Sequence, residues 1–177
     1  SEVPAVVSPV AAGSPVFLLQ RGHSDSVSSA SFSPDGATVV TASRDGTAKV
    51  WDARTGALRA TFQGYADSVE SASFSPDGAS VITLGSGAPE VWDARRGALR
   101  MSLEGEIEGH SDWVSSASFS ADGASVVTAS EDGTAKVWDA RTEALRATFA
   151  GHSDWAGEDW VESASFSPNG ASVVTVN

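Results

Sequence analysis

The residues of this chain that could carry chemistry are its three histidines, each followed by a serine and an aspartate. They stand at His23, His110 and His152. Histidine, serine and aspartate can form a nucleophilic triad, and imidazole nitrogens can bind zinc. A triad needs a nucleophile held against a base that a third group orients, and adjacent loop residues rarely give that geometry. The sequence around the histidines therefore has to show which kind of site they form.

The segment that contains His23 is repeated almost unchanged around His110. Residues 22–63 and 109–150 differ at six positions only, and looser copies begin at Gly64 and Gly151. A period of roughly 40 to 45 residues that carries a Trp-Asp pair is typical of four-stranded propeller blades. One histidine then falls on each of several sheets, too far apart for a single zinc ion. We predict no enzyme, no metal site and no cofactor.

Each copy contains four short runs rich in Val, Thr, Phe and Trp, separated by turn signals. In the first copy we expect strands over 27–33, 38–43, 47–52 and 57–62. Ser33-Pro34-Asp35-Gly36 predicts a turn, because proline presets φ for its second position and glycine accepts a positive φ. The copies are thus predicted to be antiparallel meanders, each too small to bury two faces alone.

Bulk composition restricts the partners. The 177 residues carry a formal net charge of −12 and no cysteine. A strongly acidic chain repels nucleic acid and anionic lipid, so we predict protein partners and no nucleic-acid binding. No apolar run approaches the ~20 residues of a membrane-spanning helix. The chain begins at Ser1, from which we infer a trimmed start; we expect a soluble, cytoplasmic protein, with organelle targeting left open.

In order, Gly22-His23, Ser33-Pro34-Asp35-Gly36, Asp45-Gly46-Thr47 and Trp51-Asp52 resemble the WD40 repeat. The resemblance covers about residues 14–177 and implies an all-β, WD40-type β-propeller of about four blades, with repeats starting near 22, 64, 109 and 151. Residues 1–13 form an N-terminal extension, for which an edge strand of the last blade is one role. For most of the family the resemblance implies a non-catalytic platform for protein partners.

The resemblance also implies a structural hydrogen-bond relay in each blade, from a tryptophan through a threonine to a histidine and an aspartate. These residue types suit a hydrogen-bond chain, since indole donates a hydrogen bond, a hydroxyl can both donate and accept, and a carboxylate accepts. The second blade departs, with Tyr65 in place of histidine and a turn at 84–88 that is one residue short and lacks the aspartate; we expect a weaker loop clamp and a more mobile turn there. The predicted relay residues are His23, Thr41, Asp45, Trp51, Thr83, Trp92, His110, Thr128, Asp132, Trp138, His152 and Thr175.

Three further tryptophans lie in the loops between copies, where the first copy has Ser26 and the second Ser68. Aromatic side chains on variable loops are candidates for an interface, and local capping of the blade edge is the alternative. The resemblance adds charged contact positions on the same loops and strands. The predicted partner-binding residues are Trp113, Trp155, Trp160, Arg44, Glu70, Glu131 and Glu162. A second hypothesis is a propeller that binds a small molecule or glycan by stacking on these tryptophans.

The number of strands leaves closure of the propeller open. The last copy supplies two strands, and residues 16–20 and 5–10 could supply two more. If those pair with the last copy, the chain closes into a complete four-blade ring. Otherwise self-association or a larger complex completes the ring, or the chain remains a partial propeller. We favour completion by other chains slightly over self-closure.

Overall fold

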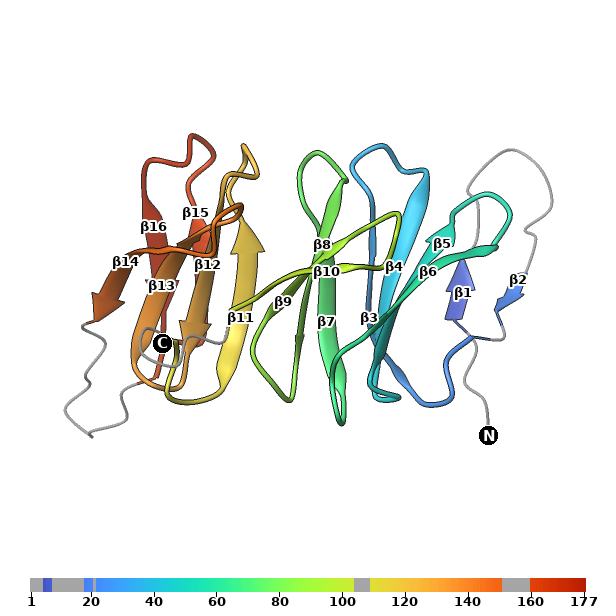
Figure 1. Cartoon of the computed structure of the whole chain (residues 1–177), viewed down its shortest axis with the longest axis horizontal. Coiled ribbons are helices and arrows are strands. Elements are labelled where there is room, and N and C mark those ends of the chain that lie inside the picture. The colour runs from blue at the N-terminus through green and yellow to red at the C-terminus, as the bar shows by residue number, and fades with distance from the viewer. Residues whose placement is uncertain (1–4, 8–17, 21, 104–108, 151–159) are drawn as a thin grey trace.

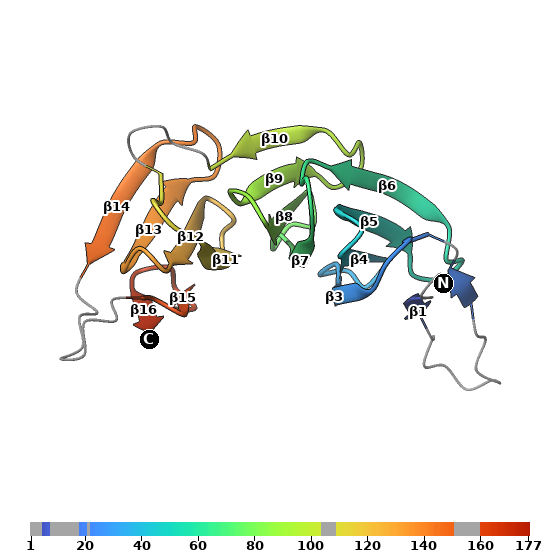
Figure 2. The same ribbon diagram turned by 90° about the horizontal axis from the view of Figure 1, so that it is seen from below.

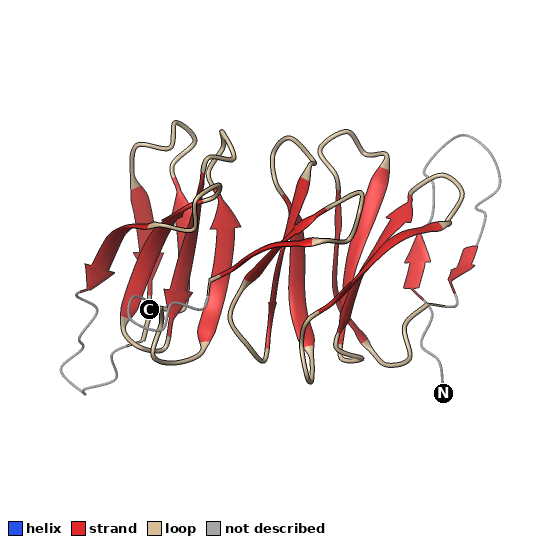
Figure 3. Cartoon of the chain, in the orientation of Figure 1, coloured by secondary structure: helices blue, strands red, loops and turns tan. Residues whose placement is uncertain are grey.

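The computed structural model describes residues 5–7, 18–20, 22–103, 109–150 and 160–177. All regular structure in these ranges is β-strand (Figure 3), arranged in five antiparallel sheets. No helix that is long and apolar enough to cross a membrane occurs in the described residues. The prediction of an all-β, WD40-type propeller architecture is confirmed.

Three sheets are four-stranded blades in which neighbouring strands follow one another along the chain. In the first blade the expected and observed strands agree to within one residue at either end. Blade 1 contains β3 (Val27–Phe32), β4 (Thr38–Ser43), β5 (Thr47–Asp52) and β6 (Leu58–Gln63); blade 2 contains β7 (Val69–Phe74), β8 (Ser80–Gly85), β9 (Glu90–Asp93) and β10 (Leu99–Ser102); blade 3 contains β11 (Val114–Phe119), β12 (Ser125–Ser130), β13 (Thr134–Asp139) and β14 (Leu145–Ala150).

The turn between the first two strands of each blade forms as its residue types require. Gly36 takes a φ of 67°, and its N–H donates to the carbonyl of Ser33 at 2.8 Å. The Ser33 hydroxyl donates to Asp35 at 2.6 Å. The same serine and aspartate bond recurs in blades 2 and 3, so the turn sets the register of every hairpin that starts a blade.

The hydrophobic core lies between the blades. The face of blade 1 that carries Val40, Val50 and Phe62 packs against Val81 and Trp92 of blade 2. The Phe62 and Trp92 rings stack with centroids 5.3 Å apart and planes 22° apart. Equivalent clusters join blade 2 to blade 3 and blade 3 to the last sheet. Each blade therefore buries its faces only through its neighbours, as the sequence predicts.

Serine hydroxyls add hydrogen bonds across two of these junctions. Ser28 of blade 1 donates to the Val69 carbonyl of blade 2 at 2.6 Å, and Ser115 of blade 3 donates to the Val161 carbonyl at 2.7 Å. In blade 2 the same position holds Glu70, which has no hydroxyl to donate. The junction between blades 2 and 3 thus lacks this serine contact.

The blades follow one another along an open arc (Figures 1 and 2). Their first strands lie on the concave side and β6, β10 and β14 on the convex side. Strands β15 (Ser163–Phe166) and β16 (Val173–Val176) pair at one end, and β1 (Ala5–Val7) and β2 (Leu18–Gln20) pair at the other. In the part of the chain that the structure describes, these two small sheets stay separate.

The four-blade ring closed by the chain's own ends was therefore a wrong alternative, and the partial propeller is the form observed. The strands expected within 5–10 and 16–20 do form, but they pair with each other and not with β15 and β16. The apolar face formed by β4, β5 and β6 of blade 1 packs on β7, β8 and β9 of blade 2, and the angle at which sheets pack in this way leaves the two ends of the arc apart (Figure 2). The boundary at residue 13 lies outside the described residues and stays a prediction.

The stack between blades 1 and 2 gives a direct test of this source of stability. Phe62 is 2% exposed, whereas the equivalent Phe149 of blade 3 is 45% exposed because no strand carrying a tryptophan faces it in the described residues. We expect Phe62→Ala to lower the free energy of unfolding by about 3 kcal/mol and Phe149→Ala to lower it by less than about 1 kcal/mol. Urea titration followed by tryptophan fluorescence measures both, and equal losses would contradict the role given to blade stacking.

Candidate functional site

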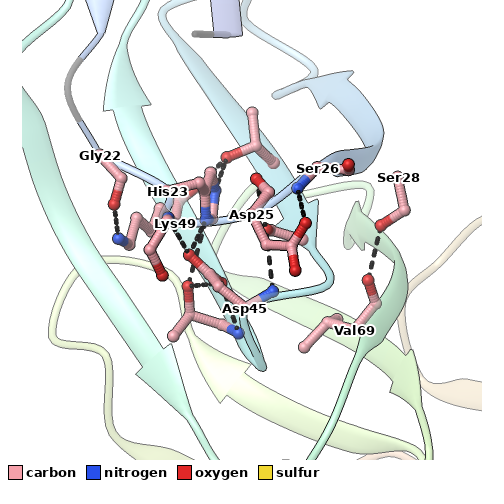
Figure 4. A network of polar contacts seen from close by, with 12 residues as sticks. Gly22, His23, Asp25, Ser26, Ser28, Asp45, Lys49 and Val69 are labelled. Atoms are coloured by element: carbon pink, nitrogen blue, oxygen red, sulfur yellow. Dashed lines mark hydrogen bonds and ion pairs between the residues drawn. The ribbon is translucent and has the colours of Figure 1, made fainter. Parts of the chain in front are cut away.

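The relay residues of blade 1 lie in one chain of hydrogen bonds. The indole N–H of Trp51 donates to the hydroxyl of Thr41 at 2.8 Å, and Thr41 Oγ1 lies 2.8 Å from His23 Nε2. His23 Nδ1 lies 2.9 Å from Asp45 Oδ2 (Figure 4). The chain runs from the buried centre of the sheet to the loop before β3, so it ties that loop to β4 and β5.

The chemistry of the partners assigns every proton in this chain. Ionised Asp45 can only accept, so His23 Nδ1 must donate to it. Neutral imidazole then has Nε2 free to accept from Thr41, whose oxygen accepts in turn from Trp51. The backbone N–H of Ser24 at 2.9 Å and the hydroxyl of Thr47 at 2.6 Å also donate to Asp45. Lys49 Nζ donates to the carbonyl of Gly22, which fastens the loop a second time (Figure 4).

Blade 3 repeats the arrangement. Trp138 donates to Thr128 at 2.9 Å, and His110 lies 2.7 Å from Thr128 and 2.9 Å from Asp132. In the last sheet, Thr175 is half-buried in β16. Its expected partner His152 lies outside the described residues, so that relay stays a prediction.

Electrostatics favour a neutral imidazole in both blades. Burial lowers the pKa of His23 and of His110 below 6.5 even though the neighbouring carboxylates raise it. Burial would raise the pKa of Asp45, but the bonds donated by Thr47, Ser24 and His23 outweigh it and lower that pKa to about 2. At neutral pH the relay thus pairs an uncharged histidine with an ionised aspartate.

The contacts of Thr41, His23 and Asp45 match those of a nucleophilic triad, with threonine in the place of the nucleophile. Thr41 is only 1% exposed, and its oxygen already accepts the indole N–H of Trp51. A substrate cannot reach a hydroxyl that is covered in this way. The described residues also hold no group of three or more His, Cys, Asp or Glu side chains placed to bind a metal.

Blade 2 uses a different clamp, which the sequence analysis did not find. The Tyr65 hydroxyl lies 2.9 Å from the Thr83 carbonyl and 3.0 Å from the Ala88 carbonyl, which share its one proton, and 3.2 Å from Thr83 Oγ1. Trp92 still donates to Thr83 at 2.8 Å. A phenol longer than imidazole therefore spans the strand and the shortened turn. The signal in the sequence was the coincidence of a tyrosine at the histidine position with a turn that lacks its aspartate.

The predicted partner-binding residues gather at one rim. We call it the histidine rim: the loops before β3, β7 and β11, residues 160–162 before β15, the first residues of these strands, and the turns β4–β5, β8–β9 and β12–β13, at the bottom of Figure 1. Trp113 is 37% exposed and Trp160 is 46% exposed. The Glu131 N–H donates to the Trp113 carbonyl at 2.9 Å, which places the two residues side by side on the rim. Arg44, Glu70, Glu131 and Glu162 are exposed, and Trp155 lies outside the described residues.

The opposite rim, which we call the arginine rim, is balanced in charge. It consists of the turns between the first two and the last two strands of blades 1 to 3 and the starts of β6, β10 and β14. Ion pairs join Arg59 to Asp52, Arg100 to Asp93 and Arg146 to Asp139. Seven of the chain's 11 basic residues stand there opposite seven acidic ones, so the net charge of −12 arises elsewhere in the chain. The basic residues are Arg54, Arg59, Arg95, Arg96, Arg100, Arg141 and Arg146, and the acidic ones Asp35, Asp52, Asp77, Asp93, Asp122, Asp139 and Glu143.

Comparison with known proteins agrees with this geometry. The family model for the WD domain, G-beta repeat, matches residues 13–52, 56–93 and 101–139. Each matched range ends on a Trp-Asp pair of the kind seen at Trp51 and Asp52. The chain belongs to the WD40 family. WD40 repeats are generally non-enzymatic platforms for protein interaction, which supports that general function for this chain.

A curated relative is similar over a short stretch. Periodic tryptophan protein 2 of Saccharomyces cerevisiae is 56% identical over 46 residues, which cover 26% of this chain and 5% of that protein. The matched stretch has about the length of one WD40 repeat. The chain therefore spans only a small part of that relative.

The relay predicts how stability depends on pH. Because the folded pKa of His23 and His110 lies below 6.5, the unfolded chain takes up protons first as the pH falls through that value. The free energy of unfolding contributed by the relays is therefore fully present above about pH 6.5 and decreases below that pH. We expect the midpoint temperature of thermal unfolding to decrease when the pH is lowered from about 7.5 to about 5.5. The decrease should be smaller in the double variant His23→Gln and His110→Gln. An equal decrease in both proteins would show that the relays do not titrate.

The tyrosine clamp predicts a local cost in blade 2. Tyr65→Phe keeps the ring and removes the hydroxyl that two backbone carbonyls and Thr83 contact. We expect a loss of about 1 to 2 kcal/mol in the free energy of unfolding, as for a buried hydrogen bond. Hydrogen exchange should accelerate at 84–88 and not in the equivalent turn of blade 3. A variant as stable as the parent would mean that the ring alone holds this loop.

Proposed function

We propose that this chain is a non-enzymatic scaffold, or a small structural subunit of a larger complex, that binds proteins through the histidine rim. The observation that carries the proposal is the contrast between two sets of tryptophans. Trp51, Trp92 and Trp138 are at most 4% exposed, whereas Trp113 and Trp160 are 37% and 46% exposed on the same rim.

The exposed tryptophans are not required by the fold. Blade 1 has Ser26 where blade 3 has Trp113, and the backbone bond made by this residue is the same in both blades. Its carbonyl accepts from Arg44 in blade 1 and from Glu131 in blade 3, at 2.9 Å each. An aromatic residue that the blade does not need is free to bury its surface against a partner, and tryptophan contributes strongly to such interfaces.

Charge restricts the kind of partner. Asp25, Asp67, Asp112 and Glu131 are exposed on the histidine rim, where Arg44 is an exposed basic residue. A rim of this sign attracts basic surfaces and repels phosphate backbones. We infer a protein partner that presents apolar side chains together with lysine or arginine.

A pair of double variants tests the proposal. Trp113→Ala with Trp160→Ala removes apolar surface from the histidine rim, and Leu58→Ala with Leu99→Ala removes exposed apolar surface from the opposite end of blades 1 and 2. We expect affinity capture by the first variant to lose specific proteins that the second retains, since loss of a central aromatic contact costs about 2 kcal/mol or more.

Both variants should unfold within about 1 kcal/mol of the parent, as exposed positions usually do. Capture that both variants leave unchanged would contradict the proposed rim. A glycan that quenches tryptophan fluorescence in the parent, but not in the Trp113→Ala and Trp160→Ala double variant, would instead favour the small-molecule or glycan-binding alternative.

A further inference from the structure

The histidine rim contains a groove of about 410 Å³ between blades 2 and 3. One wall is the shortened β8–β9 turn of blade 2, and the other is the loop that leads into β11. The side chains that shape it are mainly apolar. They include those of Pro89, Leu103, Trp113 and Val114, with Asp112 at the same wall as Trp113.

The groove exists because the turn of blade 2 is held against its own blade. The Ser86 N–H donates to the Ser68 carbonyl at 3.1 Å, and Tyr65 donates to the Ala88 carbonyl at 3.0 Å. The nearest atoms to a side chain at Gly87 would be those of the Tyr65 ring at 3.8 Å. The turn thus contacts Tyr65 and Ser68 and leaves space toward blade 3.

The junction between blades 1 and 2 is closed at the equivalent place. A Cβ atom at Gly46, in the longer turn of blade 1, would lie 2.7 Å from the Asp67 carbonyl and 3.0 Å from the Tyr65 carbonyl of the next blade. The turn of blade 1 therefore lies directly on the loop of blade 2. One missing residue and the tyrosine clamp together distinguish the open junction from the closed one.

We propose that this groove is a peptide-binding site that takes one large apolar side chain, from a partner segment that carries lysine or arginine on either side of it. The site deepens the proposed scaffold function and depends on it. Its volume lies within the range of about 300 to 1,000 Å³ typical of ligand pockets, and its walls supply an indole and aliphatic surface to cover the inserted side chain.

The surroundings of the groove specify the basic flanks. Asp112 lines it, and Glu131 is joined through its N–H to the Trp113 carbonyl. No lysine or arginine is among the lining residues. His110 also lines the groove, but it stays neutral at pH 7 because burial lowers its pKa. Residues 104–108, which contain three glutamates, join Leu103 to Gly109 in the sequence; they lie outside the described residues and are not part of the proposed site.

Synthetic peptides test the chemistry of the occupant. The probes are fluorescein-labelled Gly-Lys-Lys-Leu-Lys-Lys-Gly, the same peptide with serine in place of leucine, and the leucine peptide with glutamate in place of every lysine. We expect the lysine-leucine peptide to bind at least about 10-fold more tightly than the serine peptide, as burial of one leucine side chain implies. The glutamate peptide should show no binding. Fluorescence anisotropy at fixed salt measures all three.

Variants of the chain test the location. Gly87→Leu adds a bulky side chain to the turn that lines the groove. The substitution is compatible with the backbone because Gly87 does not have a positive φ and the nearest atoms to its Cβ position are those of the Tyr65 ring at 3.8 Å. We expect it to weaken binding of the lysine-leucine peptide at least about 10-fold, and Trp113→Ser to do the same by removing one wall. Leu99→Ser, at the opposite end of blade 2, should leave binding unchanged. Ser68→Trp, at the equivalent position beside blade 1, should create no second site, because the turn of blade 1 already lies on the loop that carries Ser68.

Several outcomes would overturn the proposal. Equal affinity for the leucine and serine peptides would mean that the rim attracts positive charge without inserting a side chain. Tight binding that survives both Gly87→Leu and Trp113→Ser would place the peptide elsewhere. If no peptide binds while the tryptophan double variant still loses captured proteins, the groove is wrong and the scaffold function stands. Circular dichroism of each variant establishes that it is folded.

Discussion

The structure depends on one constraint, that a four-stranded sheet of about 40 residues has two apolar faces and cannot bury either alone. Successive blades solve this by packing face to face, as Phe62 of blade 1 does on Trp92 of blade 2. Where the next sheet has only two strands in the described residues, the same type of position is exposed, as at Phe149. Stability is therefore a property of the junctions, and the identity of each blade matters less than the presence of its neighbour.

The hydrogen-bond relays act on this framework by fastening the loops at one end. A neutral histidine between a threonine and an aspartate holds the loop in blades 1 and 3, and a tyrosine does so in blade 2. Both clamps bind the chain to itself, which argues for a structural role for histidines that stand beside serine and aspartate. Because the loops are held, the side chains between the clamps, such as Trp113, are presented to solvent in a defined position.

The two near-identical copies separate the residues that make the blade from those that define the surface. Of the six differences between them, five lie at positions exposed in blade 3: Trp113, Ala121, Glu131, Glu143 and Ala150. Basic residues concentrate at the arginine rim in ion pairs with aspartates that each blade repeats, which leaves the histidine rim acidic. The surface at Trp113 and Glu131 can thus change without a change in the packing that supports these residues.

Much of the fold was predictable from the sequence, because strands, turns and the order of relay residues are local or repeat with the period of the blade. The resemblance to the WD40 repeat implied the relay of Trp51, Thr41, His23 and Asp45. The open arc, the clamp made by Tyr65 and the groove beside Trp113 were not predictable. They depend on the angle at which neighbouring sheets pack and on where a shortened turn comes to rest, and these are set by contacts between side chains far apart in the sequence. The repeat determined the blade, and only the tertiary structure decided how the blades meet.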